Sequence, residues 1–110
     1  MEISFATDRL RKDMVDQKSM VRRFGPERSA RIQDRLADLE AVEVLSEMRG
    51  LPGNCEELKG DRKGQLSVRL GKYYRLIFEP NDNPPALKED GGIEWAQVRS
   101  IQFLEVVDYH

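Results

Sequence analysis

Histidine, cysteine and long apolar runs are scarce in this sequence, which holds one histidine, His110, and one cysteine, Cys55, in 110 residues. A single cysteine forms no internal disulfide, and no apolar run approaches the roughly 20 residues that cross a membrane. One histidine without a cysteine cluster is no ligand set for zinc or iron, so we predict no metal site and no cofactor. The N-terminus lacks the basic and apolar blocks of a signal peptide, and we therefore expect a cytoplasmic protein.

A surplus of positive charge is also missing, since the net charge is −2 and the pI is near 5.5. These values argue against a protein that coats nucleic acid through an overall basic field. Residues 59–75 are the exception, because six basic residues and one acidic residue give this segment a net charge of +5. A concentrated basic site on an acidic body fits a local anion target or an acidic partner better than long duplex binding.

The first half of the chain predicts a strand followed by a helical hairpin. Residues 2–6 alternate between apolar and polar side chains, as a short strand does. A helical region then runs to Phe24, with a break expected near Asp16, and Gly25–Pro26 is a strong stop signal. A second helix follows from residue 26 to about 42, with an apolar stripe that can pack on a sheet.

The second half begins with a β-hairpin over residues 65–78, where apolar residues recur at every second position around a glycine. A three-residue loop at residues 71–73 makes one face wholly apolar. The expected facing pairs on it are Leu70 with Tyr74, Val68 with Leu76, and Leu66 with Phe78. The same register sets Arg69 opposite Arg75 on the other face, and like charges in that position cost stability unless an anion relieves them.

The rest of the chain predicts a polar loop and a last strand. Residues 80–92 show no periodicity, and we interpret about 80–97 as a loop insertion with Trp95 anchoring its return. The strand at residues 99–107 is expected to be covered on both sides. One face would carry Ile101 and Phe103, and the other Leu104 and Val106. We predict one α+β domain over residues 1–110, with the N-terminal strand and helical hairpin packed on one face of a small, antiparallel-rich twisted sheet.

Clustered cations and one histidine can cleave a phosphodiester without a metal. Arginine forks match two phosphate oxygens and stabilise the charge of a pentacoordinate phosphorus, while a histidine with a pKa of about 6.5 can move a proton. Arg69, Arg75 and His110 are residues of these types. Judged by residue type alone, these cations could form a charged face exposed to solvent rather than a phosphate site. The arginines that we interpret as such a face, at helical spacing, are Arg28, Arg31 and Arg35.

Three blocks of the sequence carry a resemblance: LKGDRKGQLSVR at residues 58–69, YRLIF at 74–78 and VDYH at 107–110. They resemble the HigB family of bacterial toxins in the RelE/ParE superfamily. The resemblance implies a microbial RNase-like fold and a toxin of a type II toxin–antitoxin system, an mRNA interferase that cuts translated mRNA in the ribosomal A site. The implied partners are a HigA-like helix-turn-helix antitoxin, through which operator DNA is bound, and the ribosome with its mRNA.

The resemblance also implies residue roles. Lys59, Arg69 and Arg75 would hold the scissile phosphate, and His110 would act as the general acid or base. The residues implied in contacts with ribosomal RNA or mRNA are Arg62, Lys63, Lys72 and Tyr109. Attack by the ribose 2′-OH would give a 2′,3′-cyclic phosphate without a metal, so DNA would not be cut.

Two departures and two alternatives accompany this interpretation. The family often carries tryptophan where this chain has Leu66 and Tyr74, which leaves stacking on RNA to Tyr74, to Tyr109 or to neither. Because the hairpin register points Tyr74 to the core, we favour Tyr109. One alternative is a ParE-like toxin, which has the same fold but poisons DNA gyrase and is no nuclease. The other is a non-catalytic protein kept as a partner or co-repressor of the antitoxin.

Overall fold

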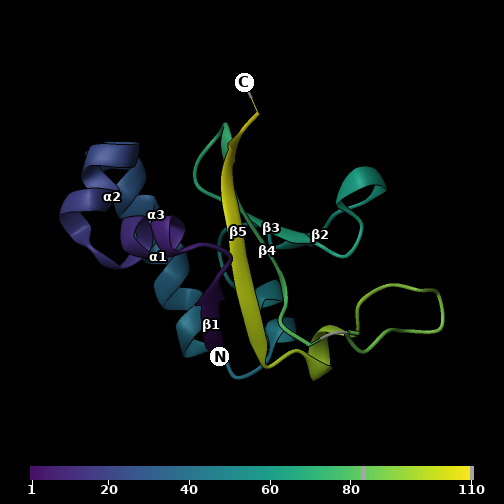
Figure 1. The fold of residues 1–110 in the computed structure, drawn as a ribbon. Coiled ribbons are helices and arrows are strands. Elements are labelled where there is room, and N and C mark those ends of the chain that lie inside the picture. Colours follow the sequence, from purple (N-terminus) through teal and green to yellow (C-terminus); the bar gives the residue numbers. More distant parts are fainter. Residues whose placement is uncertain (83, 110) are drawn as a thin grey trace.

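The structure, a computed structural model, describes residues 1–82 and 84–109. It is an α+β fold in which three helices gather on one side of a twisted sheet (Figure 1). The helices and strands are β1 (Glu2–Phe5), α1 (Asp8–Val15), α2 (Gln17–Phe24), α3 (Pro26–Ala41), β2 (Glu56–Glu57), β3 (Leu66–Arg69), β4 (Tyr74–Pro80) and β5 (Ser100–Asp108). The 3₁₀ turns are η1 (Leu45–Gly50), η2 (Gly60–Arg62) and η3 (Trp95–Gln97).

The sheet has five strands in the order β1-β5-β4-β3-β2. β1 runs parallel to β5, and the other neighbouring pairs are antiparallel, so the prediction of an antiparallel-rich sheet is confirmed. β2 was not predicted, because two residues are too few to show the alternation by which a strand is found in a sequence.

The break near Asp16 is confirmed, and local capping explains it. The Asp16 backbone is extended, with φ −101° and ψ 114°, so it ends α1 and opens α2. Its carboxylate accepts hydrogen bonds from Lys18 N at 3.3 Å and from the Ser19 hydroxyl at 2.9 Å. One helix cap at Asp16 thus turns what reads as a single helical region into an angled pair.

The hairpin register is confirmed. β3 and β4 pair Val68 with Leu76 and Arg69 with Arg75, and Leu70 N donates to Tyr74 O at 2.9 Å across the turn. The apolar face packs under the helices in one core. Its fully buried members include Ile32, Leu39, Leu66, Val68, Leu76, Phe78, Ile101 and Phe103.

The expected faces of β5 were wrong at one position. A register shift opposite Ile77 and Phe78 leaves Leu104 unpaired, which is a β-bulge. As a result, Val106 pairs with Leu76 and packs against the core, on the same face as Phe103. Strict alternation along a strand fails wherever one extra residue is inserted into the ladder.

Part of the stretch predicted as a loop without periodicity is ordered. The chain folds back on itself through a bridge between Leu87 and Ile93 and a hydrogen bond from Lys88 N to Gly92 O at 2.7 Å. η3 then leads into β5. This folded-back segment, residues 86–94, is named the 86–94 loop below, and it lies at the β2 edge of the sheet (Figure 1).

Candidate functional site

Arg69 and Arg75, named the arginine pair below, lie directly opposite each other at the turn end of β3 and β4. Arg69 is exposed and Arg75 is half-buried. Arg75 Nη1 donates to Tyr74 O at 3.1 Å, which holds its guanidinium beside the turn. Neither arginine has an ion pair among residues 1–82 and 84–109. Two unneutralised cations face to face favour an anion between them.

The C-terminal end of β5 lies beside the turn that joins β3 and β4 (Figure 1). β5 pairs Val107 with Arg75, and Tyr109 N donates to Tyr73 O at 2.7 Å. The Tyr109 ring is half exposed, and its centroid is 5.6 Å from the guanidinium carbon of Arg75. An exposed aromatic ring next to cations is the usual arrangement for stacking a base. His110, the predicted general acid or base, lies outside the described residues.

Lys72 lies in the turn itself, and its ammonium is 5.3 Å from the Tyr73 ring centroid. It adds a third cation to the turn end of the hairpin. Together with the arginine pair and Tyr109, this end of the sheet can bind a phosphate and hold a base beside it.

The cations of the 59–75 segment do not all lie together. Leu58 N donates to Gln65 O, so Lys59 lies at the far end of β3 from Arg69. Lys59 lines a cavity of about 310 Å³ with residues of the 86–94 loop, including Lys88. No contact joins Lys59 to the arginine pair within the part of the chain that the structure describes. The sequence predicts that Lys59, Arg69 and Arg75 form one cationic cluster, whereas the structure places Lys59 and the arginine pair at opposite ends of β3.

Arg62 and Lys63 differ in their surroundings. Arg62 donates to Gln65 Oε1 at 2.9 Å and forms an ion pair of 3.5 Å with Glu105. Lys63 is exposed. Ser67, Ile77 and Glu105 stand opposite one another across β3, β4 and β5, so the ion pair joins Arg62 to the β5 member of this row. The guanidinium of Arg62 is therefore engaged within the fold.

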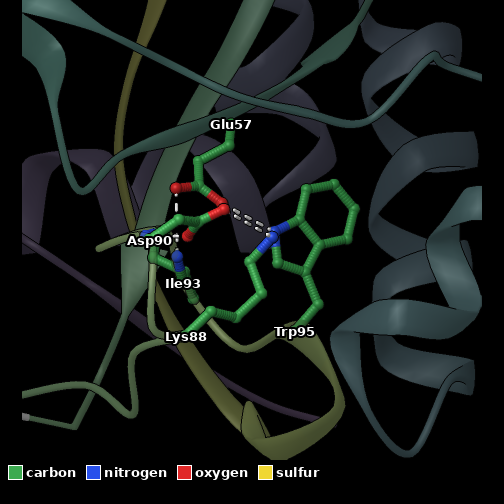
Figure 2. A network of polar contacts seen from close by, with 6 residues as sticks. Glu57, Lys88, Asp90, Ile93 and Trp95 are labelled. Atoms are coloured by element: carbon green, nitrogen blue, oxygen red, sulfur yellow. Dashed lines mark hydrogen bonds and ion pairs between the residues drawn. The ribbon is translucent and has the colours of Figure 1, made fainter.

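Glu57 fastens the 86–94 loop to β2. Its two carboxylate oxygens accept from Ile93 N and from the indole Nε1 of Trp95, both at 3.0 Å (Figure 2). On the loop, Lys88 and Asp90 form an ion pair of 3.7 Å. Trp95 is buried, so the prediction that it anchors the return of the loop is confirmed.

The arginines of α3 were wrongly interpreted as a wholly solvated face. The guanidinium carbon of Arg28 lies 3.6 Å from the centroid of the Tyr74 ring, a cation–π contact. Arg35 is largely buried beside Gly53 and pairs with Asp38 at 3.4 Å. A helix that packs on a sheet can use long arginine stems as packing surface, and charge alone does not reveal that.

Sequence reasoning missed a second basic cluster, on α1 and α2. Residues 9–23 hold six basic and two acidic residues, a net charge of +4. They line a cavity of about 260 Å³, whose walls are Arg9, Lys12, Asp13, Ser19, Arg22 and Arg23. The charge count applied to residues 59–75 would have found this segment too.

Cys55 is half-buried against the core, and burial raises the pKa of its thiol to about 12. It therefore stays a protonated thiol, as expected of a small core residue. Within residues 1–82 and 84–109, no group of three or more His, Cys, Asp or Glu side chains is placed to hold a metal ion. In the same part of the chain, no helix is both long and apolar enough to span a bilayer.

Known proteins resemble this chain in sequence or in fold. A family model for RelE-like toxins of the type II toxin–antitoxin system HigB matches residues 3–87. Toxin HigB-1 of Vibrio cholerae serotype O1 is 46% identical over 46 residues, which are 41% of this chain and 48% of that protein. The chain thus spans about half the length of this curated relative.

Solved structures agree in fold. A YoeB/ParE toxin from Agrobacterium tumefaciens superimposes with a TM-score of 0.60 at 14% identity, over 100% of this chain and 99% of the other. The toxin fold in a YoeB-YefM complex from Staphylococcus aureus gives a TM-score of 0.57 at 18% identity, over 100% and 97%. These identities show the fold alone. Because the family model covers most of its length and the fold agrees, the chain belongs to the HigB-like family of RelE-like toxins.

Proposed function

We propose that this protein is the toxin of a type II toxin–antitoxin system and that it cuts mRNA on the ribosome. The arginine pair carries the proposal, because it places two cations without a counter-ion in the described chain at the turn end of β3 and β4, where Arg75 lies beside the exposed ring of Tyr109. That arrangement suits a phosphate with a base on one side. Membership of the HigB-like family supports the toxin assignment.

The proposed reaction is an in-line displacement at phosphorus. The ribose 2′-OH forms the new O–P bond, the bond from phosphorus to the 5′-oxygen breaks, and the products are a 2′,3′-cyclic phosphate and a 5′-OH. Arg69 and Arg75 neutralise the charge that grows on the phosphoryl oxygens. The 2′-OH loses its proton as it attacks, and the 5′-oxygen gains one as it leaves. We assign this net transfer of a proton to His110, acting as the general acid or base, and we assign stacking of the neighbouring base to Tyr109.

The remaining basic residues are assigned to binding. Lys72, in the turn, would contact the RNA backbone next to the scissile phosphate. Lys59 and Lys63, toward the other end of β3, would contact mRNA or ribosomal RNA rather than the reacting phosphate. Arg62 would do so only after leaving Glu105, to which it is paired at 3.5 Å.

The partners belong to the same proposal. The matched family belongs to a type II toxin–antitoxin system, which supports a cognate antitoxin. We assign that role to a HigA-like helix-turn-helix protein that binds operator DNA. The proposed target is the ribosome with its mRNA, and the toxin would therefore act in the cytoplasm.

The test maps new RNA 5′ ends after brief expression in bacteria, with and without a drug that strips ribosomes from mRNA. We expect wild type to produce cuts within reading frames that need ribosomes, and Arg75→Ala and His110→Ala to lose them by at least about 100-fold. Arg11→Ala, which removes an exposed cation on α1, is the control and should cut as wild type does.

Two results contradict the proposal. Growth arrest by wild type without new RNA ends would instead indicate a target such as gyrase, and neither arrest nor cuts would indicate a non-catalytic partner of the antitoxin. Full cutting by Arg75→Ala would leave the toxin assignment in place and remove the arginine pair from the site.

A further inference from the structure

A second polar cavity lies on the same sheet face as the arginine pair. Side chains at residues 75, 77 and 79 of β4 share one face, because successive strand residues alternate. Glu79 stands directly opposite Gln102 of β5. Both line a cavity of about 500 Å³, named the Glu79 cavity here; its other walls are Gly64, Pro80, Asn81, Asp82 and Pro85. Arg75 and Glu79 are four residue steps apart along β4, about 13 Å at about 3.3 Å per residue, so an RNA strand that lies across the arginine pair can extend to the cavity.

The chemistry of the Glu79 cavity is opposite to that of the arginine pair. Its walls include two carboxylates, of Glu79 and Asp82, and the amide of Gln102, but no basic residue. Neither carboxylate has an ion pair in residues 1–82 and 84–109. The guanidinium of Arg62 is already paired with Glu105. Such a cavity repels a phosphate and accepts groups that donate hydrogen bonds.

The cavity wall is held in place before any ligand arrives. Asn81 Nδ2 donates to the hydroxyls of Ser4 and Ser100, both at 2.9 Å, and Asn81 N donates to Ser100 O at 3.0 Å. These bonds tie the end of β4 to β1 and β5. Glu79 and Gln102 lie within strands, so their positions do not depend on the loop that follows. Prearranged polar groups bind at lower entropic cost than mobile ones.

We propose that the Glu79 cavity binds a nucleobase next to the cut and selects bases that carry an amino group over uracil. A carboxylate accepts hydrogen bonds from the exocyclic amino group of cytosine, adenine or guanine, and a glutamine amide can pair with adenine. Uracil offers carbonyl oxygens where those bases offer amino hydrogens, and a carboxylate repels them. Single-stranded RNA presents these base edges to proteins. This inference rests on the proposed function, since it places the RNA strand across the arginine pair.

The direct test measures binding of short oligonucleotides made with 2′-deoxyribose, which cannot be cut, and varied at one base. We expect wild type to bind oligonucleotides with adenine or cytosine at that position at least about fivefold more tightly than those with uracil. Glu79→Ala should reduce the ratio to less than twofold. Glu89→Ala, an exposed acidic residue that does not line the cavity, is the matched control and should keep the wild-type ratio. Thermal melting of each variant establishes that it is folded.

A second test separates this inference from the proposed function. Cut sites mapped in cells should favour an amino-bearing base near the cut in wild type, and Glu79→Ala should cut sites with uracil at that position as often as sites with an amino-bearing base. If wild type and Glu79→Ala cut with the same base preference, the cavity assignment is overturned and the proposed nuclease activity stands. Base-dependent binding without any cutting by wild type would overturn the nuclease and leave the cavity. Equal binding of all bases by wild type, or loss of antitoxin binding alone in Glu79→Ala, would overturn the inference.

Discussion

Removing the Glu57 carboxylate should release the 86–94 loop and destabilise the protein. In Glu57→Ala, the Ile93 amide and the Trp95 indole lose acceptors at 3.0 Å, and both residues are buried, 2% and 5% exposed. A hydrogen bond to a charged group contributes about 1.5–3 kcal/mol, so two would contribute about 3–6 kcal/mol. Because an undocked loop regains hydrogen bonds to water, the lower end is expected. A loss of about 3 kcal/mol lowers the melting temperature of a domain this size by about 12 °C or more.

Thermal unfolding and tryptophan emission measure this loss. Trp95 is the single tryptophan and directly follows the 86–94 loop, so its emission reports on how this segment is docked and should shift to the red in Glu57→Ala as the ring meets water. Glu56→Ala is the matched control, because Glu56 is the exposed neighbour on β2, and its melting temperature should stay within about 2 °C of wild type. If both variants melt together with unchanged emission, the carboxylate does not hold the loop and the reasoning from Figure 2 is wrong.

Two further predictions concern local conformation. The Ser19 hydroxyl holds the pKa of Asp16 below its usual value of 3.8, so ionised Asp16 stabilises the native state at neutral pH. The melting temperature of Asp16→Ala should therefore lie below that of wild type by the full amount at pH 7, and the difference should vanish as the pH falls through the lowered pKa. A difference that does not change with pH would exclude the charged cap. Gly71→Ala should cost about 1–3 kcal/mol in urea unfolding, since φ is +101° and a Cβ would lie 2.1 Å from Arg31 Nη1. Gly91→Ala, with φ +90° and open space, should cost less, and equal losses would mean that Arg31 simply moves aside.

Local chemistry explains why much of the fold was predictable. The hairpin register follows from alternation at every second residue together with a three-residue turn, and both properties lie within residues 65–78. The ends of the helices follow from Asp16 and from Gly25–Pro26, which act on the backbone beside them. The pairing of Arg69 with Arg75 therefore follows from the sequence, and this central arrangement of the candidate site could be stated without the structure.

Other features depend on residues far apart in the chain. Glu57 and Trp95 are 38 positions apart, and nothing in either neighbourhood specifies that a β2 carboxylate meets the indole. Lys59 is separated from the arginine pair because residues 58–65 close into a turn at the start of β3, where Leu58 N donates to Gln65 O, while Arg69 ends the strand. A charge count contains no information about where the chain turns.

The sequence by itself determined the α+β class, the helix ends, the hairpin register and the family, because periodicity, caps and short motifs act over a few residues. Only the tertiary structure decided the β-bulge at Leu104, the docking of the 86–94 loop and the placing of Glu79 opposite Gln102. Each of these depends on how distant strands pack and pair, and the free energy of that packing is shared among side chains that no local pattern connects.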